Sequence, residues 1–423
     1  MSLAADSILI AGPETSNPIA ISGVQAVVTA DASGDAAPIT VEAGRLELVD
    51  GGLIFGGTYG AGDGGAIEVV ADVLVVRGDN GRVDDNLVFS GLFVSTVPGS
   101  SGDGGTISVE AGRVEVLDGG AISGTTTGAG HGGAVTVTAG ELLLGEDGLV
   151  SSQTRGSGNA GLVRISASRS LTVDGAGVVT NSTTDGIAGD VSVQAPTLVL
   201  RDGGEIGSSG LGAGRAGDVR LEAGTLRVED TSVRTVGTGA EGGRVEVAAD
   251  DLVLLRDAEV TSSGIEPRAG ASLITLEAPL IVLLDGSRVT SLTGAGAPLG
   301  GSGEARLLGD LTFISGDSEV LGSSTVELAG VDNNVGTGLQ ISPGAFLDAG
   351  NLLGQGCAAR RTGKASSFTR AGRGGLPPSP DRPLASGEAP ERGRAASAED
   401  GRLLIAGLAL SGECEGLPPA APM

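Results

Sequence analysis

An aspartate recurs about every 28 residues along much of the chain, each time where a short apolar segment ends. Stacked carboxylates at a regular spacing could hold Ca²⁺, which prefers oxygen ligands. Aspartate also favours tight Asp-Gly turns, because it tolerates a left-handed backbone. We expect turn formation, with calcium binding as the alternative, for the aspartate column Asp50, Asp118, Asp147, Asp174, Asp202, Asp230, Asp257 and Asp285.

A second column of polar residues recurs inside the glycine-rich loops. Its residue type changes from loop to loop, whereas a repeated calcium motif would keep the same acidic ligand in every copy. We therefore predict no regular metal site here and solvent-facing side chains for Asp63, Asp103, His131, Asn159, Ile187, Arg215 and Glu241. His131 is the only histidine, and a solvated side chain in a glycine loop is a poor candidate for a general base.

The groups that enzymes use are scarce in this chain. It has no tryptophan, one tyrosine and one histidine, and its single lysine is Lys364. A nucleophile elbow, a phosphate-binding loop followed by a helix, and a Cys/His metal cluster are all missing from the sequence. We predict a protein that is not an enzyme and uses no cofactor or metal. A carbohydrate-active β-helix enzyme remains the alternative.

The two cysteines, Cys357 and Cys414, lie far apart near the C-terminus. In an oxidising compartment they could form a disulfide that closes a loop of almost 60 residues, and otherwise they are two free thiols.

Charge limits the partners of the protein. The net charge is −26, and the segment from Cys357 onward, with nine basic and seven acidic residues, carries +2 of it. The body therefore carries −28, which repels nucleic acid. No run approaches the roughly 20 apolar residues that span a membrane, and the first residues lack the features of a signal peptide.

A repeat organises most of the sequence. Copies of the motif in "ISVEAGRVEVLDGGAI" (Ile107 onward) are aligned by one alanine, with steps of 28, 40, 28, 28, 28, 28, 26 and 29 between Ala43, Ala71, Ala111, Ala139, Ala167, Ala195, Ala223, Ala249 and Ala278. Apolar and polar residues alternate within each copy, which is typical of strands too short to be stable alone. We predict an all-β, right-handed, single-stranded parallel β-helix of about 11 coils of about 28 residues, with a corner at each Ala-Gly pair. Propeller blades are usually longer and carry aromatic motifs, which this chain lacks.

Composition divides the chain into a repeat domain, residues 1–350, and an irregular, largely extended tail rich in Pro, Arg and Ser, residues 351–423. The step of 40 indicates a 12-residue insertion, and residues 84–98 around it are unusually apolar. We predict a candidate contact loop there, formed by Leu87, Val88, Phe89, Leu92 and Phe93. The alternative is that this segment folds back over the rod.

The tail carries a motif, "SSFTRAGRGGLPPSP", preceded by Gly356–Cys357. Together with the coils and the "GNAG" at Gly158–Gly161, it resembles the C-terminal part of cyanobacterial filamentous-haemagglutinin-like exoproteins. The residues that match are Ser366, Ser367, Phe368, Gly372, Arg373, Gly374, Gly375, Leu376, Pro377 and Pro378.

This resemblance implies two-partner secretion through an outer-membrane transporter that recognises an N-terminal domain. It also implies a place at the cell surface or in the medium, and adhesion to other cells or to surface polysaccharide. The chain lacks the family's N-terminal secretion domain, so we expect a C-terminal part of a split or truncated gene, or a misassigned start. An inactive passenger fragment is the further alternative, and no binding residue is transferred from the family.

Overall fold

The computed structural model describes residues 1–12, 22–83, 86–238, 242–264, 272–293, 303–331, 402–405 and 408–411. The chain divides into two compact units, Met1–Asp332 and Asn333–Met423. The predicted domain boundary at residue 350 lies outside the described residues. Within the described part of the chain, no helix is long and apolar enough to cross a membrane.

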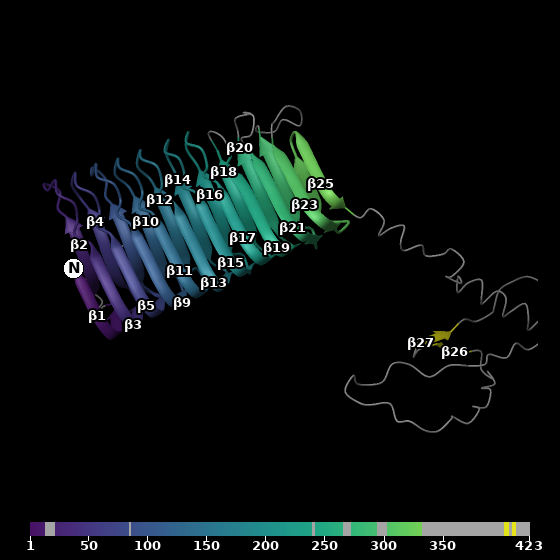
Figure 1. The fold of residues 1–423 in the computed structure, drawn as a ribbon, viewed down its shortest axis with the longest axis horizontal. Helices are drawn as coiled ribbons and strands as arrows, with labels where there is room; N and C mark the ends of the chain where they lie inside the picture. The colour runs from purple at the N-terminus through teal and green to yellow at the C-terminus, as the bar shows by residue number, and fades with distance from the viewer. Residues whose placement is uncertain are drawn as a thin grey trace, which may run out of the picture. The chain divides into compact units, whose positions relative to one another are not determined.

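Two long parallel sheets run side by side along the first unit (Figure 1). The first sheet has 12 strands: β1 (Ser2–Ala11), β3 (Ile39–Val49), β5 (Ile67–Arg77), β9 (Ile107–Leu117), β11 (Val135–Gly145), β13 (Val163–Asp174), β15 (Val191–Arg201), β17 (Val219–Glu229), β19 (Arg244–Arg256), β21 (Leu273–Leu284), β23 (Glu304–Ile314) and β25 (Thr325–Val331). Each strand pairs in parallel with its equivalents in the preceding and following coils.

The second sheet has 11 shorter strands, one for each coil: β2 (Ser22–Val28), β4 (Gly52–Thr58), β8 (Gly91–Thr96), β10 (Ala121–Thr126), β12 (Leu149–Thr154), β14 (Gly177–Ser182), β16 (Glu205–Gly210), β18 (Ser232–Gly237), β20 (Glu259–Gly264), β22 (Arg288–Thr293) and β24 (Glu319–Gly322). Two antiparallel hairpins complete the structure: β6 (Asp79–Val83) with β7 (Asn86–Phe89), and β26 (Arg402–Ile405) with β27 (Leu408–Ser411).

The predicted stacking of the repeats is confirmed. Ala111 is the strand partner of Ala71 on one side and of Ala139 on the other, so the alanines of successive copies are spatial neighbours. Inward side chains of both sheets form one continuous aliphatic core along the rod, and Ile107, Val135 and Ile122 are each at most 1% exposed. The fold is thus an all-β parallel β-helix, as the sequence predicts.

The expected corner at each Ala-Gly pair is wrong. In the first sheet a single strand of 11 residues, β9, continues through Ala111 and Gly112. Ala111 and Val114 both face the core, while Gly112 and Arg113 between them are exposed. Two successive outward residues therefore change the phase of the alternation without ending the strand, as in a bulge.

The aspartate column forms turns, as expected. Seven of its eight members have a positive φ, from 46° to 60°, between the first and second sheets. The exception, Asp174, precedes Gly175, which takes the positive φ of 60° instead. The left-handed conformation is costly for most side chains but tolerated by aspartate and glycine, which explains why these two residue types recur here.

This explanation predicts the effect of changing Asp202, whose φ is 56°. Asp202→Val should lower the free energy of unfolding by about 1–2 kcal/mol, because a β-branched side chain is disfavoured in this conformation. Asp202→Gly also removes the carboxylate that lies 3.4 Å from Arg201, yet keeps the backbone conformation accessible, so its stability should stay close to wild type. Chemical denaturation measures both variants. Equal losses would show that the carboxylate, rather than the turn, determines stability at this position.

Glycine backbones stack directly on one another along the third side of the rod. In one column, a Cβ atom added to any glycine would lie closer than 3.0 Å to the carbonyl oxygen of the equivalent glycine in the preceding coil, as at Gly105, Gly133, Gly161, Gly189, Gly217 and Gly243. A second column behaves in the same way at Gly102, Gly130, Gly158, Gly186 and Gly214. The abundance of glycine thus reflects coils that approach too closely for side chains.

Buried hydroxyls attach this glycine side to the second sheet. Ser208 Oγ donates to the carbonyl oxygen of Gly189 (2.9 Å) and accepts from the amide of Gly217 (2.8 Å). Ser262 Oγ makes the same type of bond to Gly243 (2.6 Å). These serines replace apolar residues at inward positions because the loop backbone needs hydrogen-bond partners inside the rod.

Candidate functional site

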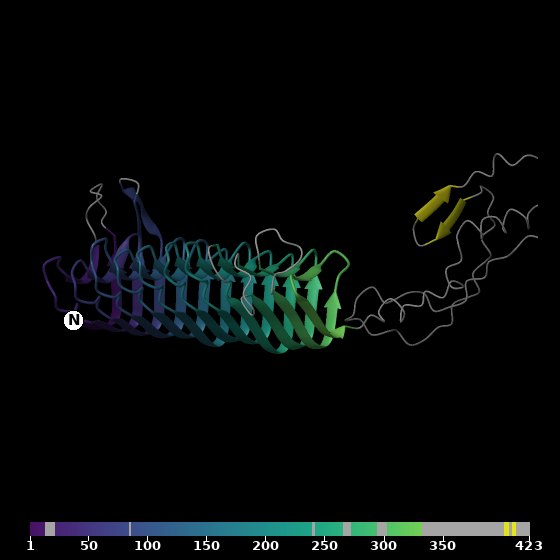
Figure 2. The same cartoon turned by 90° about the horizontal axis from the view of Figure 1, so that it is seen from above.

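The predicted insertion is an antiparallel hairpin. Strands β6 and β7 lie between β5 of the first sheet and β8 of the second, and they project away from the rod beyond the second sheet (Figure 2). Asp79 and Phe89 are strand partners at its base. Ser90 follows directly and is fully buried, and its Oγ accepts a hydrogen bond from the amide of Gly51 (2.8 Å). This bond attaches the base of the hairpin to the preceding coil.

The five residues of the predicted contact loop are in different environments. Phe89 is exposed (39%), and Phe93 is half-buried on the outer face of β8. Leu92 is fully buried in the core, so its assignment as a contact residue is wrong: the strand alternation turns it inward between outward-facing neighbours. The side chains of Leu87 and Val88 lie outside the described part of the structure.

Aromatic residues gather around this hairpin. The chain has six phenylalanines and one tyrosine, and four of these seven are Phe55, Tyr59, Phe89 and Phe93. Phe55 on β4 and Phe93 on β8 are strand partners. A Cβ atom on Gly57 would lie 2.5 Å from the ring of Phe55, and one on Gly91 would lie 2.9 Å from the ring of Phe93. Each ring therefore lies over a glycine of its own strand, close to the sheet.

The sheet face around these two rings carries no charge. On β2, β4, β8, β10, β12 and β14, the three outward positions of each strand form a surface that we call the neutral face: Gly23, Gln25, Val27, Leu53, Phe55, Gly57, Gly91, Phe93, Ser95, Ala121, Ser123, Thr125, Leu149, Ser151, Gln153, Gly177, Val179 and Asn181. Sequence analysis missed this face. Its signal was readable in segments such as "GLFVST" and "LVSSQT", which lack Asp, Glu, Lys and Arg in an acidic chain.

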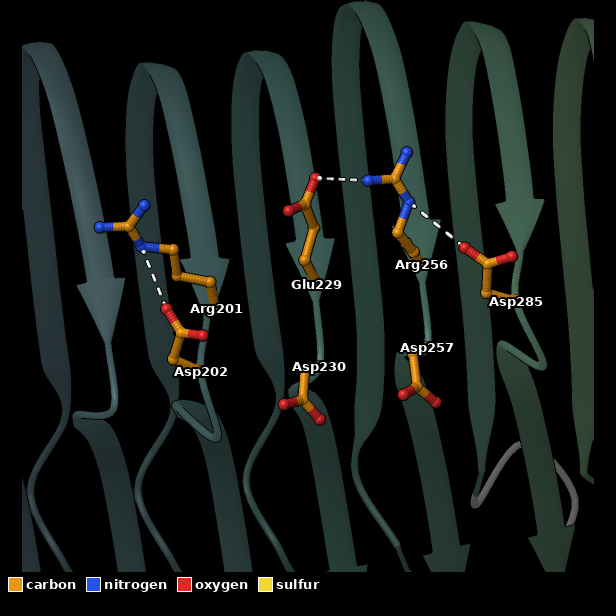
Figure 3. Close-up of a pocket in the computed structure, with 7 residues that line it drawn as sticks. All are labelled: Arg201, Asp202, Glu229, Asp230, Arg256, Asp257 and Asp285. Atoms are coloured by element: carbon orange, nitrogen blue, oxygen red, sulfur yellow. Dashed lines mark ion pairs between the residues drawn. The ribbon is translucent and has the colours of Figure 1, made fainter.

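Charged residues occupy a different surface, where the aspartate turns meet the end of the first sheet. We call this surface the charged row. In Figure 3, Arg256 lies between Glu229 (3.9 Å) and Asp285 (3.4 Å), and Arg201 lies 3.4 Å from Asp202. The row is completed by Asp230 and Asp257.

Arginine in the charged row neutralises carboxylates. Arg201 also contacts Asp174 at 2.6 Å, and this pairing raises the pKa of Arg201. The pairs are largely exposed, so each contributes little to stability. Among the described residues, no group of three or more His, Cys, Asp or Glu side chains could hold a metal ion. The charged row is best explained as a ladder of surface ion pairs between coils.

The polar column of the glycine loops is not solvent-facing filler, which corrects our expectation. Each side chain from Asp63 to Asn159 accepts a hydrogen bond from the backbone amide of the equivalent residue in the following coil. The bonds are Asp63 Oδ1 to Asp103 (2.8 Å), Asp103 Oδ1 to His131 (2.7 Å), His131 Nδ1 to Asn159 (3.0 Å) and Asn159 Oδ1 to Ile187 (2.9 Å). His131 is therefore a structural acceptor in its neutral form, with the proton on Nε2. The varied residue types share this ability to accept, which sequence analysis overlooked.

Two predicted features, the pair Cys357 and Cys414 and the tail motif from Ser366 to Pro378, fall outside the described residues, as does Glu241 of the loop column. Comparison of the chain with protein-family models, with curated proteins and with solved structures finds no match.

Proposed function

We propose that this β-helix is a non-enzymatic, adhesin-like exoprotein whose rod displays a contact surface at the hairpin β6–β7. The observation that carries this proposal is the location of the aromatic residues. In a chain that is 2% aromatic, four aromatic residues lie beside the one hairpin that interrupts the described coils of the first unit. Exposed aromatic side chains are enriched where proteins bind partners, because they bury a large area at a low entropic cost.

We further propose export by two-partner secretion, through an outer-membrane transporter, to the cell surface or the medium. Support comes from the resemblance of the tail motif and the coils to filamentous-haemagglutinin-like exoproteins. The acidic surface of the body is compatible with a soluble extracellular rod, since its net charge opposes non-specific association.

The hairpin can be removed without cutting the core, which allows a direct test. Residues 80–88 are deleted and Asp79 is joined to Phe89 by two glycines, because these residues are already strand partners. We expect the melting temperature to change little, and adhesion of protein-coated beads to bacterial cells to fall at least about tenfold. Counting the beads retained under flow measures the effect.

A matched control removes one whole coil, residues 163–190, which shortens the rod by a single repeat and leaves the hairpin intact. Because the coils are equivalent, the two new neighbours should stack in register. This control should adhere like the wild type. Full adhesion by the hairpin deletion, or no adhesion by the wild type, would contradict the proposal.

A further inference from the structure

We propose that the neutral face binds an extended, uncharged polysaccharide lying along the rod axis. This inference deepens the proposed function and rests on it, since it gives the adhesive rod a class of ligand. It is carried by three properties of the neutral face: its charge, its two flat aromatic rings and the spacing of its polar side chains.

Charge excludes the other classes of polymer. The body of the protein is strongly acidic, so an anionic polysaccharide is repelled from every side of the rod. A cationic polymer would instead be drawn to exposed carboxylates such as Asp230 and Asp257 in the charged row. The neutral face offers no ionic partner to either, and an uncharged polymer with many hydroxyl groups matches it best.

The aromatic pair provides a platform for sugar rings. Phe55 and Phe93 occupy adjacent strands, and each ring lies close to the sheet over a glycine, Gly57 or Gly91. Both side chains are half-buried, so part of each ring remains accessible. A pyranose ring has an apolar face of C–H bonds, which packs on such a surface with little loss of side-chain entropy, because the phenylalanines are already held in place.

Polar side chains continue from this platform along the rod. Ser95, Thr125, Gln153 and Asn181 lie at equivalent positions of β8, β10, β12 and β14, and all four are half-buried. Neighbouring strands are about 4.8 Å apart, which is close to the length of one pyranose unit in an extended chain. Each coil can therefore offer one hydroxyl or amide group to each successive sugar.

The face ends where charge returns. The next strand, β16, places Glu205 on the outer surface, and Arg234 on β18 binds its carboxylate at 2.6 Å. Six strands separate this ion pair from the start of the neutral face, so the site should accommodate about six sugar units.

Affinity electrophoresis of the full chain tests the inference. Native gels contain hydroxyethyl cellulose, galactomannan or dextran as neutral polymers, and polygalacturonate or chitosan as charged ones. We expect retardation by at least one neutral polymer. The double variant Phe55→Ala/Phe93→Ala should weaken that binding at least about tenfold. Phe313→Ala is the matched control, because Phe313 is an exposed phenylalanine (40%) on β23 of the other sheet, and it should bind like the wild type.

A second variant keeps the test valid if the double variant fails to fold. Asn181→Asp changes one surface atom and places a charge on the neutral face, and it should also weaken binding. Retention by no neutral polymer, or equal retention of the wild type and both variants, would overturn the inference. So would a dimer that dissociates in the Phe55→Ala/Phe93→Ala variant, since a second copy would then cover the face. Cell adhesion without glycan binding refutes this inference alone, whereas glycan binding without cell adhesion refutes only the proposed function.

Discussion

Gly189→Ala is expected to lower the free energy of unfolding by about 3 kcal/mol or more. Its new Cβ atom would lie closer than 3.0 Å to two backbone atoms of Gly161, the carbonyl oxygen and the carbonyl carbon. Neither atom can rotate away as a side chain would, so the coils would have to separate. Separation would also disturb the bond that Ser208 makes to the carbonyl oxygen of Gly189.

A matched glycine provides the control. Gly316 has no atom within 4 Å of an added Cβ, and its φ lies outside the left-handed range. Gly316→Ala should be neutral or slightly stabilising, because alanine restricts the unfolded chain. Thermal and chemical denaturation of both variants measure the difference. Equal stability of the two variants would show that the glycine columns are not required for close stacking of the coils.

Leu198→Ala is expected to cost about 2–5 kcal/mol, because it opens a cavity in the aliphatic core. Leu198 on β15 is fully buried, between Leu171 and Leu226 of the neighbouring coils. The adjacent residue Val199 points outward and is half-buried, so Val199→Ala removes a side chain of similar type from the same strand without opening the core. Its loss should be less than about 1 kcal/mol.

The position of a coil along the rod should change the size of this effect. Ile10 on β1 is only partly buried, and its strand pairs with β3 alone. Because each coil contacts only its neighbours, Ile10→Ala should affect unfolding of the first coils rather than of the whole rod. Hydrogen exchange measured by mass spectrometry separates the two cases. Equal loss of protection along the rod in both variants would contradict nearest-neighbour stability.

The sequence indicated the β-helix because its information is local and repeated. One alternating pattern with a period near 28 residues allows only equivalent residues to stack, and the alanine pairs Ala43–Ala71 and Ala195–Ala223 confirm this register. The aspartate turns were predictable for the same reason. A left-handed residue at a corner depends on its own backbone and on very little beyond it.

Three features depended on contacts between coils, and sequence analysis missed or misjudged them. The continuation of β9 through Ala111 and Gly112 depends on hydrogen bonds to the strands on either side. The acceptor role of His131 depends on the amide of Asn159, 28 residues away. Both residues are unremarkable in their own segments, so local patterns carried no signal for these roles.

The sequence alone thus determined which residues point inward and that the coils stack. The tertiary structure alone decided which outward residues become neighbours. Phe55 and Phe93 are partners at an offset of 38 residues because the hairpin lies between their strands, whereas most other pairs are about 28 residues apart. Inward positions are fixed by local alternation and the need to exclude water, but an outward surface is composed across strands, and its members become known only when the register of every strand is known.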